Sequence, residues 1–222
     1  LEPRVQGLQP AAASRRFPSY LAPAMTQLPE LPLTLSRQEI RKMIRQRRRA
    51  LTPEQQQEMG QQAATRMMTY PPVVMAHTVA VFLSFELDTQ PLIEQLWRAG
   101  KRVYLPVLHP FSAGNLLFLN YHPQSELVMN RLKIHEPKLD VRDVLPLSRL
   151  DVLITPLVAF DEYGQRLGMG GGFYDRTLQN WQHYKTQPVG YAHDCQLVEK
   201  LPVEEWDIPL PAVVTPSKVW EW

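Results

Sequence analysis

The residues best suited to chemistry form a glycine-rich run at 168–172, GMGGG, followed directly by Phe173, Tyr174 and Asp175. Glycine has no Cβ, so its backbone N–H groups can turn toward an anion, and a helix that begins just after them adds its dipole. We expect a buried strand at 151–158, upstream of this run. Open α/β sheets bind ligands at the carboxyl ends of their strands, so the run predicts an anion site.

The glycine run matches neither of the two commonest phosphate-binding motifs. The dinucleotide motif G-x-G-x-x-G would need a glycine in place of Phe173, and the P-loop motif would need Lys-Ser or Lys-Thr after the glycines. Taken alone, the run could be a tight structural turn. Its neighbours favour function, because Arg166 supplies a cation and Asp175 a carboxylate that can hold Mg²⁺ beside phosphates. Cation, amide cradle and metal carboxylate are the parts that phosphoryl transfer requires.

The positive charge of the chain is concentrated in one short segment. Residues 37–49 carry seven Lys or Arg against one acid, whereas residues 50–222 sum to −5 and the whole chain to +2. A mildly acidic body is a poor surface for a long polyanion, so the basic segment favours a compact anion as partner. No apolar run reaches the roughly 18 residues that a transmembrane helix needs. The single cysteine, Cys195, excludes an internal disulfide and suits a reducing, cytoplasmic compartment.

The elements that must position these residues follow an alternating pattern. Ser36 with Glu39 forms a capping-box pattern at the start of a helix, and Thr52-Pro53 starts a second helix that Pro71-Pro72 ends. Beyond them we expect strands at 78–84, 102–108, 116–121, 151–158, 187–192 and 212–215, and helices at 89–99, capped by Thr89, and at 174–184. The alternation predicts an α/β fold, a three-layer sandwich with a largely parallel, Rossmann-like sheet flanked by helices.

The N-terminal residues do not share this pattern. Residues 1–24 contain four prolines and no sustained apolar period, so we expect them to be a disordered or non-native extension. Met25 follows directly and could be the true start. Residues 25–222 are expected to form a single catalytic α/β domain.

At these residues the chain resembles the 5-formyltetrahydrofolate cyclo-ligases, also called methenyltetrahydrofolate synthetases. The segments that carry the resemblance are RLGMGGGFYD at 166–175, Phe160-Asp161, ELDT at 86–89, the basic helix at 37–51, and IHEP at 134–137. It spans residues 36–215. It implies an enzyme that converts 5-formyltetrahydrofolate to 5,10-methenyltetrahydrofolate with ATP and Mg²⁺, through a phosphorylated formyl intermediate, releasing ADP and phosphate. A monomer without nucleic-acid or membrane partners is expected.

The resemblance also implies roles for individual residues. The catalytic residues would be Arg166, Tyr174 and Asp175. ATP would be bound by Arg37, Arg41, Arg166, Leu167, Gly168, Met169, Gly170, Gly171, Gly172, Phe173 and Tyr174. The folate would be bound by Leu83, Glu86, Phe173 and Tyr174, with the Glu86 carboxylate accepting hydrogen bonds from the pterin. The metal would be held by Asp175 and Asp207.

Two features depart from the family pattern. Members often carry a base at one or both of the positions of Met169 and Gly171, and both residues are neutral here. More of the phosphate charge must then be neutralised by Arg166, Arg37, Arg41 and the metal. The connection Ser84-Phe85-Glu86 is also about two residues shorter than is usual in the family.

Two other classes of function stay open on the sequence. Sugar-phosphate isomerases contain similar α/β sheets, and they bind phosphate without hydrolysing ATP. The basic segment at 37–49 could instead make the chain a non-catalytic RNA-binding module. Against this stand the acidic remainder of the chain and the lack of aromatic residues within the basic run.

Overall fold

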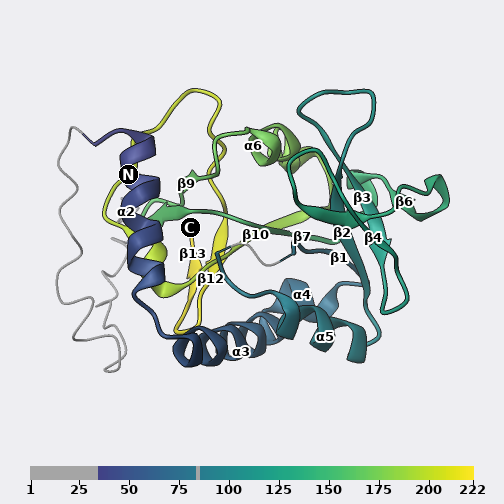
Figure 1. The fold of residues 1–222 in the computed structure, drawn as a ribbon, viewed down its shortest axis with the longest axis horizontal. Coiled ribbons are helices and arrows are strands. Elements are labelled where there is room, and N and C mark those ends of the chain that lie inside the picture. Colours follow the sequence, from purple (N-terminus) through teal and green to yellow (C-terminus); the bar gives the residue numbers. More distant parts are fainter. Residues whose placement is uncertain (1–34, 84–85) are drawn as a thin grey trace, which may run out of the picture.

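The computed structural model describes residues 35–83 and 86–222 (Figure 1). The expectations for the N-terminal extension, for its boundary at residue 25 and for the short connection at Ser84 and Phe85 lie outside these residues. Of the described helices, none is long and apolar enough to span a membrane.

A mixed sheet forms the centre of the fold, with eight strands in the described residues in the order β13-β12-β10-β7-β1-β2-β3-β6. The five middle strands, from β12 to β2, run parallel, and the outer strands pair antiparallel. The strands are β1 (Thr78–Ala80), β2 (Arg102–Leu108), β3 (Leu116–Tyr121), β6 (Val144–Leu145), β7 (Val152–Thr155), β10 (Gln187–Tyr191), β12 (Ala212–Val214) and β13 (Val219–Glu221). Smaller sheets combine β8 (Ala159–Asp161), β9 (Arg166–Leu167) and β11 (Leu197–Val198), and β4 (Leu127–Met129) with β5 (His135–Pro137).

The first two helices begin where the sequence predicts. The Ser36 hydroxyl accepts from the Glu39 N–H at 3.1 Å, and Thr52 forms a complete capping box with Gln55. The helices are α2 (Arg37–Arg49), α3 (Pro53–Thr69), α4 (Pro71–Met75), α5 (Gln90–Arg98) and α6 (Phe173–Leu178). Short 3₁₀ turns lie at Val141–Asp143, Leu147–Arg149, Trp181–His183 and Asp194–Gln196.

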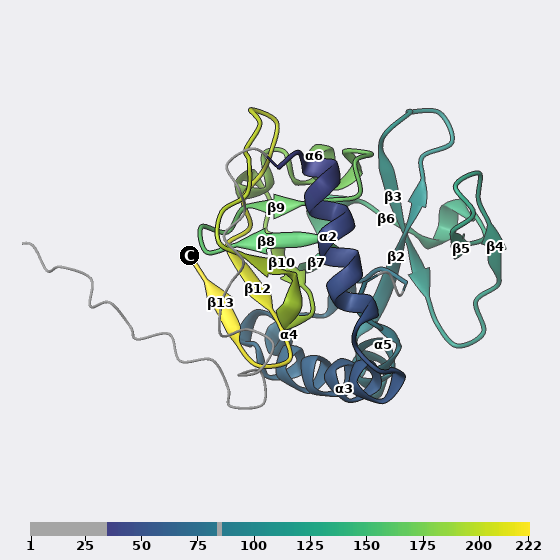
Figure 2. The same cartoon turned by 60° about the vertical axis from the view of Figure 1, so that its left-hand side comes forward.

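The two faces of the central sheet are buried in different cores. Successive residues of a strand point to opposite faces, so Val79 packs in the core shared with α3 and α5 while Ala80 packs in the core shared with α6. Figure 1 shows α3, α4 and α5 on one side of the sheet and α6 on the other. The prediction of a three-layer α/β fold is confirmed. Helix α2 buries Ile40 and Ile44 in a third cluster, against the small sheet that contains β8 and β9 (Figure 2).

Several predicted boundaries are too long, for local reasons. The first strand ends at Ala80 rather than residue 84, because the backbone leaves the sheet after the Val81 N–H bonds to the Tyr104 carbonyl. The strand expected at 151–158 ends at Thr155, since the following Pro156 has no N–H for the ladder. The helix expected at 174–184 ends at Leu178, because Gln179 leaves the helical conformation with a ψ of 126°, and Asn180 follows with a positive φ of 60°.

Thr89 is the N-cap residue of α5, as predicted, but its side chain makes no capping hydrogen bond. Its hydroxyl donates to the Phe82 carbonyl at 2.6 Å instead. The Gln90 N–H finds its acceptor in the Asp88 carboxylate at 3.0 Å. Thr89 therefore ties the start of α5 to the segment that follows β1.

Candidate functional site

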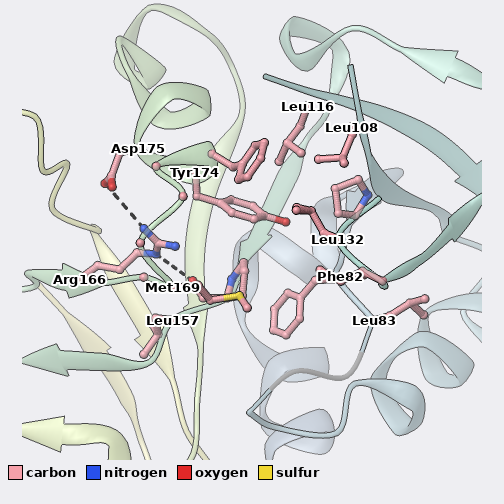
Figure 3. Close-up of a pocket in the computed structure, with 18 of the residues that line it drawn as sticks. Phe82, Leu83, Leu108, Leu116, Leu132, Leu157, Arg166, Met169, Tyr174 and Asp175 are labelled. Carbon is pink, nitrogen blue, oxygen red and sulfur yellow. Dashed lines mark hydrogen bonds and ion pairs between the residues drawn. The ribbon is translucent and has the colours of Figure 1, made fainter. Parts of the chain in front are cut away.

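A cavity of about 600 Å³ opens at the carboxyl edge of the central sheet. Leu83, which follows β1, Leu108, which ends β2, and Leu157, which follows β7, all line it. This is the edge at which the sequence predicted a ligand. The glycine loop, residues 168–172, forms part of its wall, together with Phe173, Tyr174 and Asp175 (Figure 3).

The glycine loop presents a row of free backbone donors. The N–H groups of residues 169–175 have no hydrogen-bond acceptor in the part of the chain that the structure describes. Gly170 and Gly172 have φ angles of 107° and 70°, which residues with a Cβ rarely adopt. The chain therefore holds these donors open in a conformation that requires glycine, as expected of an anion cradle.

Helix α2 brings two cations to this loop. The Arg41 Nε donates to the Gly168 carbonyl at 2.7 Å. Burial and the neighbouring charges of Arg37 and Arg45 lower the pKa of the Arg41 guanidinium. Arg37 also lines the cavity, and it donates to both carboxylate oxygens of Asp207, at 2.7 and 3.2 Å. Arg37 and Arg41 thus face the same cavity, in agreement with their spacing of one helical turn, and Arg41 contacts the glycine loop directly.

Arg166 is a buried cation within the cavity wall. Its Nε donates to the Pro156 carbonyl at 2.8 Å, and its Nη1 is 3.7 Å from the Asp175 Oδ1. Its guanidinium carbon is 5.6 Å from the centre of the Tyr174 ring. Burial lowers the pKa of Arg166, while the charge of Asp175 acts in the opposite direction. Arg166 and Asp175 therefore stabilise one another at a position where both line the cavity.

Asp175 is the carboxylate best placed for a metal ion. Its Oδ1 is buried and accepts no hydrogen bond. Asp207 differs, because its carboxylate already accepts from Arg37 and, at 2.8 Å, from the Glu204 N–H. Among the described residues no three His, Cys, Asp or Glu side chains gather to hold a metal. Mg²⁺ usually takes one or two carboxylates and completes its shell with phosphate oxygens and water, so Asp175 fits Mg²⁺ that arrives with phosphates.

Tyr174 points its ring into the cavity (Figure 3). Its hydroxyl is buried and has no hydrogen-bond partner. Burial raises the pKa of this hydroxyl, outweighing the nearby charge of Arg166, which lowers it. Tyr174 is therefore a neutral hydrogen-bond donor for a ligand and is poorly suited to be a base.

The side of the cavity across from Arg166 and Asp175 carries several leucines (Figure 3), although the polar residues Asn130, His135 and Glu136 also line the cavity. Leu83, which the sequence indicated, meets Leu108, Leu116 and Leu132 there. The last three were missed, because they come from separate segments: Leu108 and Leu116 are opposite one another in β2 and β3, and Leu132 lies between β4 and β5. Trp206, also missed, lines the cavity with 62% of its surface exposed. Its only signal in the sequence is its position beside Asp207.

Glu86 does not line the cavity in this structure. Its carboxylate is 4% exposed, contacts the Arg48 guanidinium, and lies 3.5 Å from the Arg45 Nε. The role of Glu86 in folate binding stays a prediction. The basic helix thus pairs its second half with Glu86 and its first half with Asp207 and the glycine loop.

His193 lies next to Glu86 and gives stability a predictable dependence on pH. Its Nε2 is 3.1 Å from the Glu86 carbonyl oxygen, and burial lowers its pKa from 6.5 to about 4. The unfolded chain binds this proton below pH 6.5, while the folded chain does not until about pH 4, so stability falls as the pH drops through that window. From pH 7 to 5 we expect His193 to cost about 2 kcal/mol in the free energy of unfolding.

Urea unfolding at both pH values checks this expectation against His193→Gln, whose side chain does not titrate. The variant should lose less stability between pH 7 and pH 5 than the unsubstituted chain. If both lose the same amount, the proton is not excluded from folded His193.

The fold and the cavity together define an α/β protein in which one cavity joins the open N–H groups of a glycine loop and three arginines to a largely apolar wall. A model of the 5-formyltetrahydrofolate cyclo-ligase family matches residues 34–216. The chain therefore belongs to this family and is a ligase.

Individual relatives support the assignment. The chain is 99% identical over 182 residues to the 5-formyltetrahydrofolate cyclo-ligase of Escherichia coli (strain K12), covering 81% of this chain and 100% of the relative. It is 52% identical over 179 residues to the Haemophilus influenzae cyclo-ligase, covering 80% and 96%. The solved 5,10-methenyltetrahydrofolate synthetase of Aquifex aeolicus matches with a TM-score of 0.72 and 27% identity, over 84% of this chain and 93% of the other.

Proposed function

We propose that the chain converts 5-formyltetrahydrofolate to 5,10-methenyltetrahydrofolate with ATP and Mg²⁺, through a phosphorylated formyl intermediate, releasing ADP and phosphate. One observation carries the proposal. A single cavity joins the free N–H groups of residues 169–175 and the cations Arg37, Arg41 and Arg166 to an apolar wall. The cationic part suits the phosphates of ATP, and the apolar part suits the ring system of a folate.

In this proposal the formyl oxygen attacks the γ-phosphorus of ATP while the bond to the ADP oxygen breaks. N10 of the folate then attacks the activated formyl carbon, and the phosphate departs with the former formyl oxygen as N10 loses its proton. These steps need charge neutralisation and positioning more than a strong base. The neutral Tyr174 hydroxyl is available to donate a hydrogen bond to the formyl or phosphate oxygens.

The remaining residues bind and orient the two substrates. The backbone of residues 167–174 would surround the phosphates, with Arg37 and Arg41 replacing the charge that Met169 and Gly171 do not supply. Asp175 would hold Mg²⁺, which neutralises phosphate charge when bound; Asp207 would join it only after release by Arg37. Leu83 and Phe173 would contact the pterin; Glu86 would join them only after leaving its ion pair with Arg48.

The test is the growth of methenyltetrahydrofolate absorbance from purified protein. We expect the absorbance to grow only when 5-formyltetrahydrofolate, ATP and Mg²⁺ are all present. One molecule of ADP should form for each molecule of methenyltetrahydrofolate. Turnover that continues without ATP would contradict the proposal and favour the isomerase class. If a strong chelator leaves turnover unchanged, the reaction does not need Mg²⁺, and that part of the proposal is wrong.

We further propose that the enzyme acts as a cytoplasmic monomer with only small-molecule partners. The basic helix supports the part of this proposal that concerns nucleic acids, because its arginines are largely engaged within the molecule. Arg37, Arg41, Arg45, Arg47 and Arg48 each contact a carboxylate or a backbone carbonyl. A steep salt dependence of RNA affinity, measured by filter binding, would contradict this view of the helix.

A further inference from the structure

Arg176 connects two parts of the cavity wall that are far apart in the sequence. Its Nε donates to the Gly114 carbonyl at 2.6 Å, and its Nη2 donates to the Gly171 carbonyl at 2.5 Å. Gly114 lies in the turn between β2 and β3, and Gly171 lies in the glycine loop. One planar guanidinium, with donors fixed in direction, therefore holds both segments at once.

The surrounding residues are shaped for this contact. A Cβ on Gly114 would lie 2.7 Å from the guanidinium, and a Cβ on Gly172 would lie 2.9 Å from its Nη1. Both glycines also have positive φ angles, 80° and 70°. The guanidinium carbon is 5.4 Å from the centre of the Phe173 ring. The side chain is thus enclosed by two glycines and an aromatic ring, although it lies at the surface.

The bond to Gly171 also orients the loop. In a planar trans peptide the C=O and N–H point in opposite directions, so holding the Gly171 carbonyl directs the Gly172 N–H away from Arg176. Gly171 and Gly172 line the cavity, whereas Arg176 does not. The arginine thus keeps the carbonyl outside and leaves a donor of the anion cradle facing the ligand.

The bond to Gly114 acts on the other half of the cavity. The β2–β3 hairpin carries Leu108 and Leu116, which line the apolar wall on either side of this turn. Anchoring Gly114 to the glycine loop fixes the spacing between the apolar wall and the anion cradle.

We propose that Arg176 is a positioning residue of the cyclo-ligase reaction, which sets the geometry of the anion cradle and of the folate wall together. The inference rests on the proposed function, because it takes ATP to bind at the glycine loop. In this inference Arg176 contacts neither substrate. Loss of the Arg176 side chain should therefore weaken the binding of both substrates, because each half of the cavity loses its support.

The experiment compares Arg176→Ala, Arg176→Lys and, as a matched control, Arg98→Ala. Arg98 is exposed at the end of α5 and, within the described residues, pairs with Glu94 alone. For Arg176→Ala we expect KM to rise about tenfold for both ATP and 5-formyltetrahydrofolate, because small displacements of positioned groups are costly. Arg176→Lys should recover only part of this, since an ammonium lacks the planar donors. Arg98→Ala should match the unsubstituted enzyme.

Two readouts separate positioning from a general loss of structure. Thermal unfolding should place Arg176→Lys within a few degrees of the unsubstituted chain, so its kinetic defect cannot come from unfolding. Equilibrium binding of 5-formyltetrahydrofolate without nucleotide should also weaken in the Arg176 variants, and this readout stands even if the enzyme does not use ATP. Unchanged folate binding in both variants, or an Arg176→Lys enzyme with normal KM values, would overturn the proposal.

Discussion

Asp175→Asn is expected to reduce turnover by about 100-fold or more while leaving folate affinity within about twofold. The Asp175 Oδ1 is buried and accepts no hydrogen bond, and it lines the cavity beside the glycine loop. Asparagine keeps the size of the side chain but removes the charge that would hold Mg²⁺ against the phosphates. A metal needed only for phosphoryl transfer lowers the barrier and leaves folate binding unaffected.

The measurement pairs kcat at saturating substrates with equilibrium binding of 5-formyltetrahydrofolate. Because Asp175 also lies 3.7 Å from the buried Arg166, thermal unfolding must show that the variant remains folded at the assay temperature. Glu205→Gln is the control, since it removes an exposed carboxylate close to Asp207 in the chain. An equal loss of turnover and folate affinity would argue against a metal role for Asp175.

The glycine loop could be predicted from the sequence because its chemistry is local. Consecutive glycines, a preceding strand and a following helix lie within a short stretch, and each constrains the backbone of the next. The α/β layers could be predicted for the same reason, because alternation of apolar strands and helices is visible along the chain. Strand ends were less predictable, since Val81 is apolar enough for a strand and only its tertiary surroundings end the pairing.

Pairings between distant segments could not be predicted in this way. Arg37 and Asp207 were both assigned to the site, yet their bidentate ion pair depends on where the 199–211 loop returns over α2. Arg176 carries no motif, and its partner Gly114 looks like an ordinary turn residue. Glu86 was predicted to face the ligand, whereas its surroundings in the fold offer it Arg45 and Arg48. A charged side chain pairs with what the fold brings near it, and one sequence does not contain that information.

The basic helix shows how such pairings matter for function. Its arginines are held in place by acceptors of this chain, among them Asp207 and the Gly168 carbonyl. Phosphate oxygens are stronger acceptors for a guanidinium than a backbone carbonyl is. In the proposed function, ATP would therefore offer Arg41 a better partner than the Gly168 carbonyl, and binding would use cations that are already positioned.

Arg41→Ala is therefore expected to raise KM for ATP by about tenfold or more, with KM for 5-formyltetrahydrofolate nearly unchanged. Arg41 is buried against the glycine loop and lines the cavity, so its loss removes a charge-assisted contact that exposed arginines cannot replace. The KM of Arg41→Lys for ATP should lie between those of the unsubstituted enzyme and Arg41→Ala, because a lysine keeps the charge without the fixed donors that reach Gly168.

Lys42→Ala is the matched control for this prediction. It removes one positive charge from the next position of the same helix, but Lys42 is exposed and does not line the cavity. Steady-state kinetics with each substrate varied in turn should leave Lys42→Ala near the unsubstituted enzyme. The contrast with Arg176 is also informative, since Arg41→Ala should affect ATP alone and Arg176→Ala both substrates. If Arg41→Ala leaves the affinity for ATP unchanged, the phosphates do not lie along this face of α2.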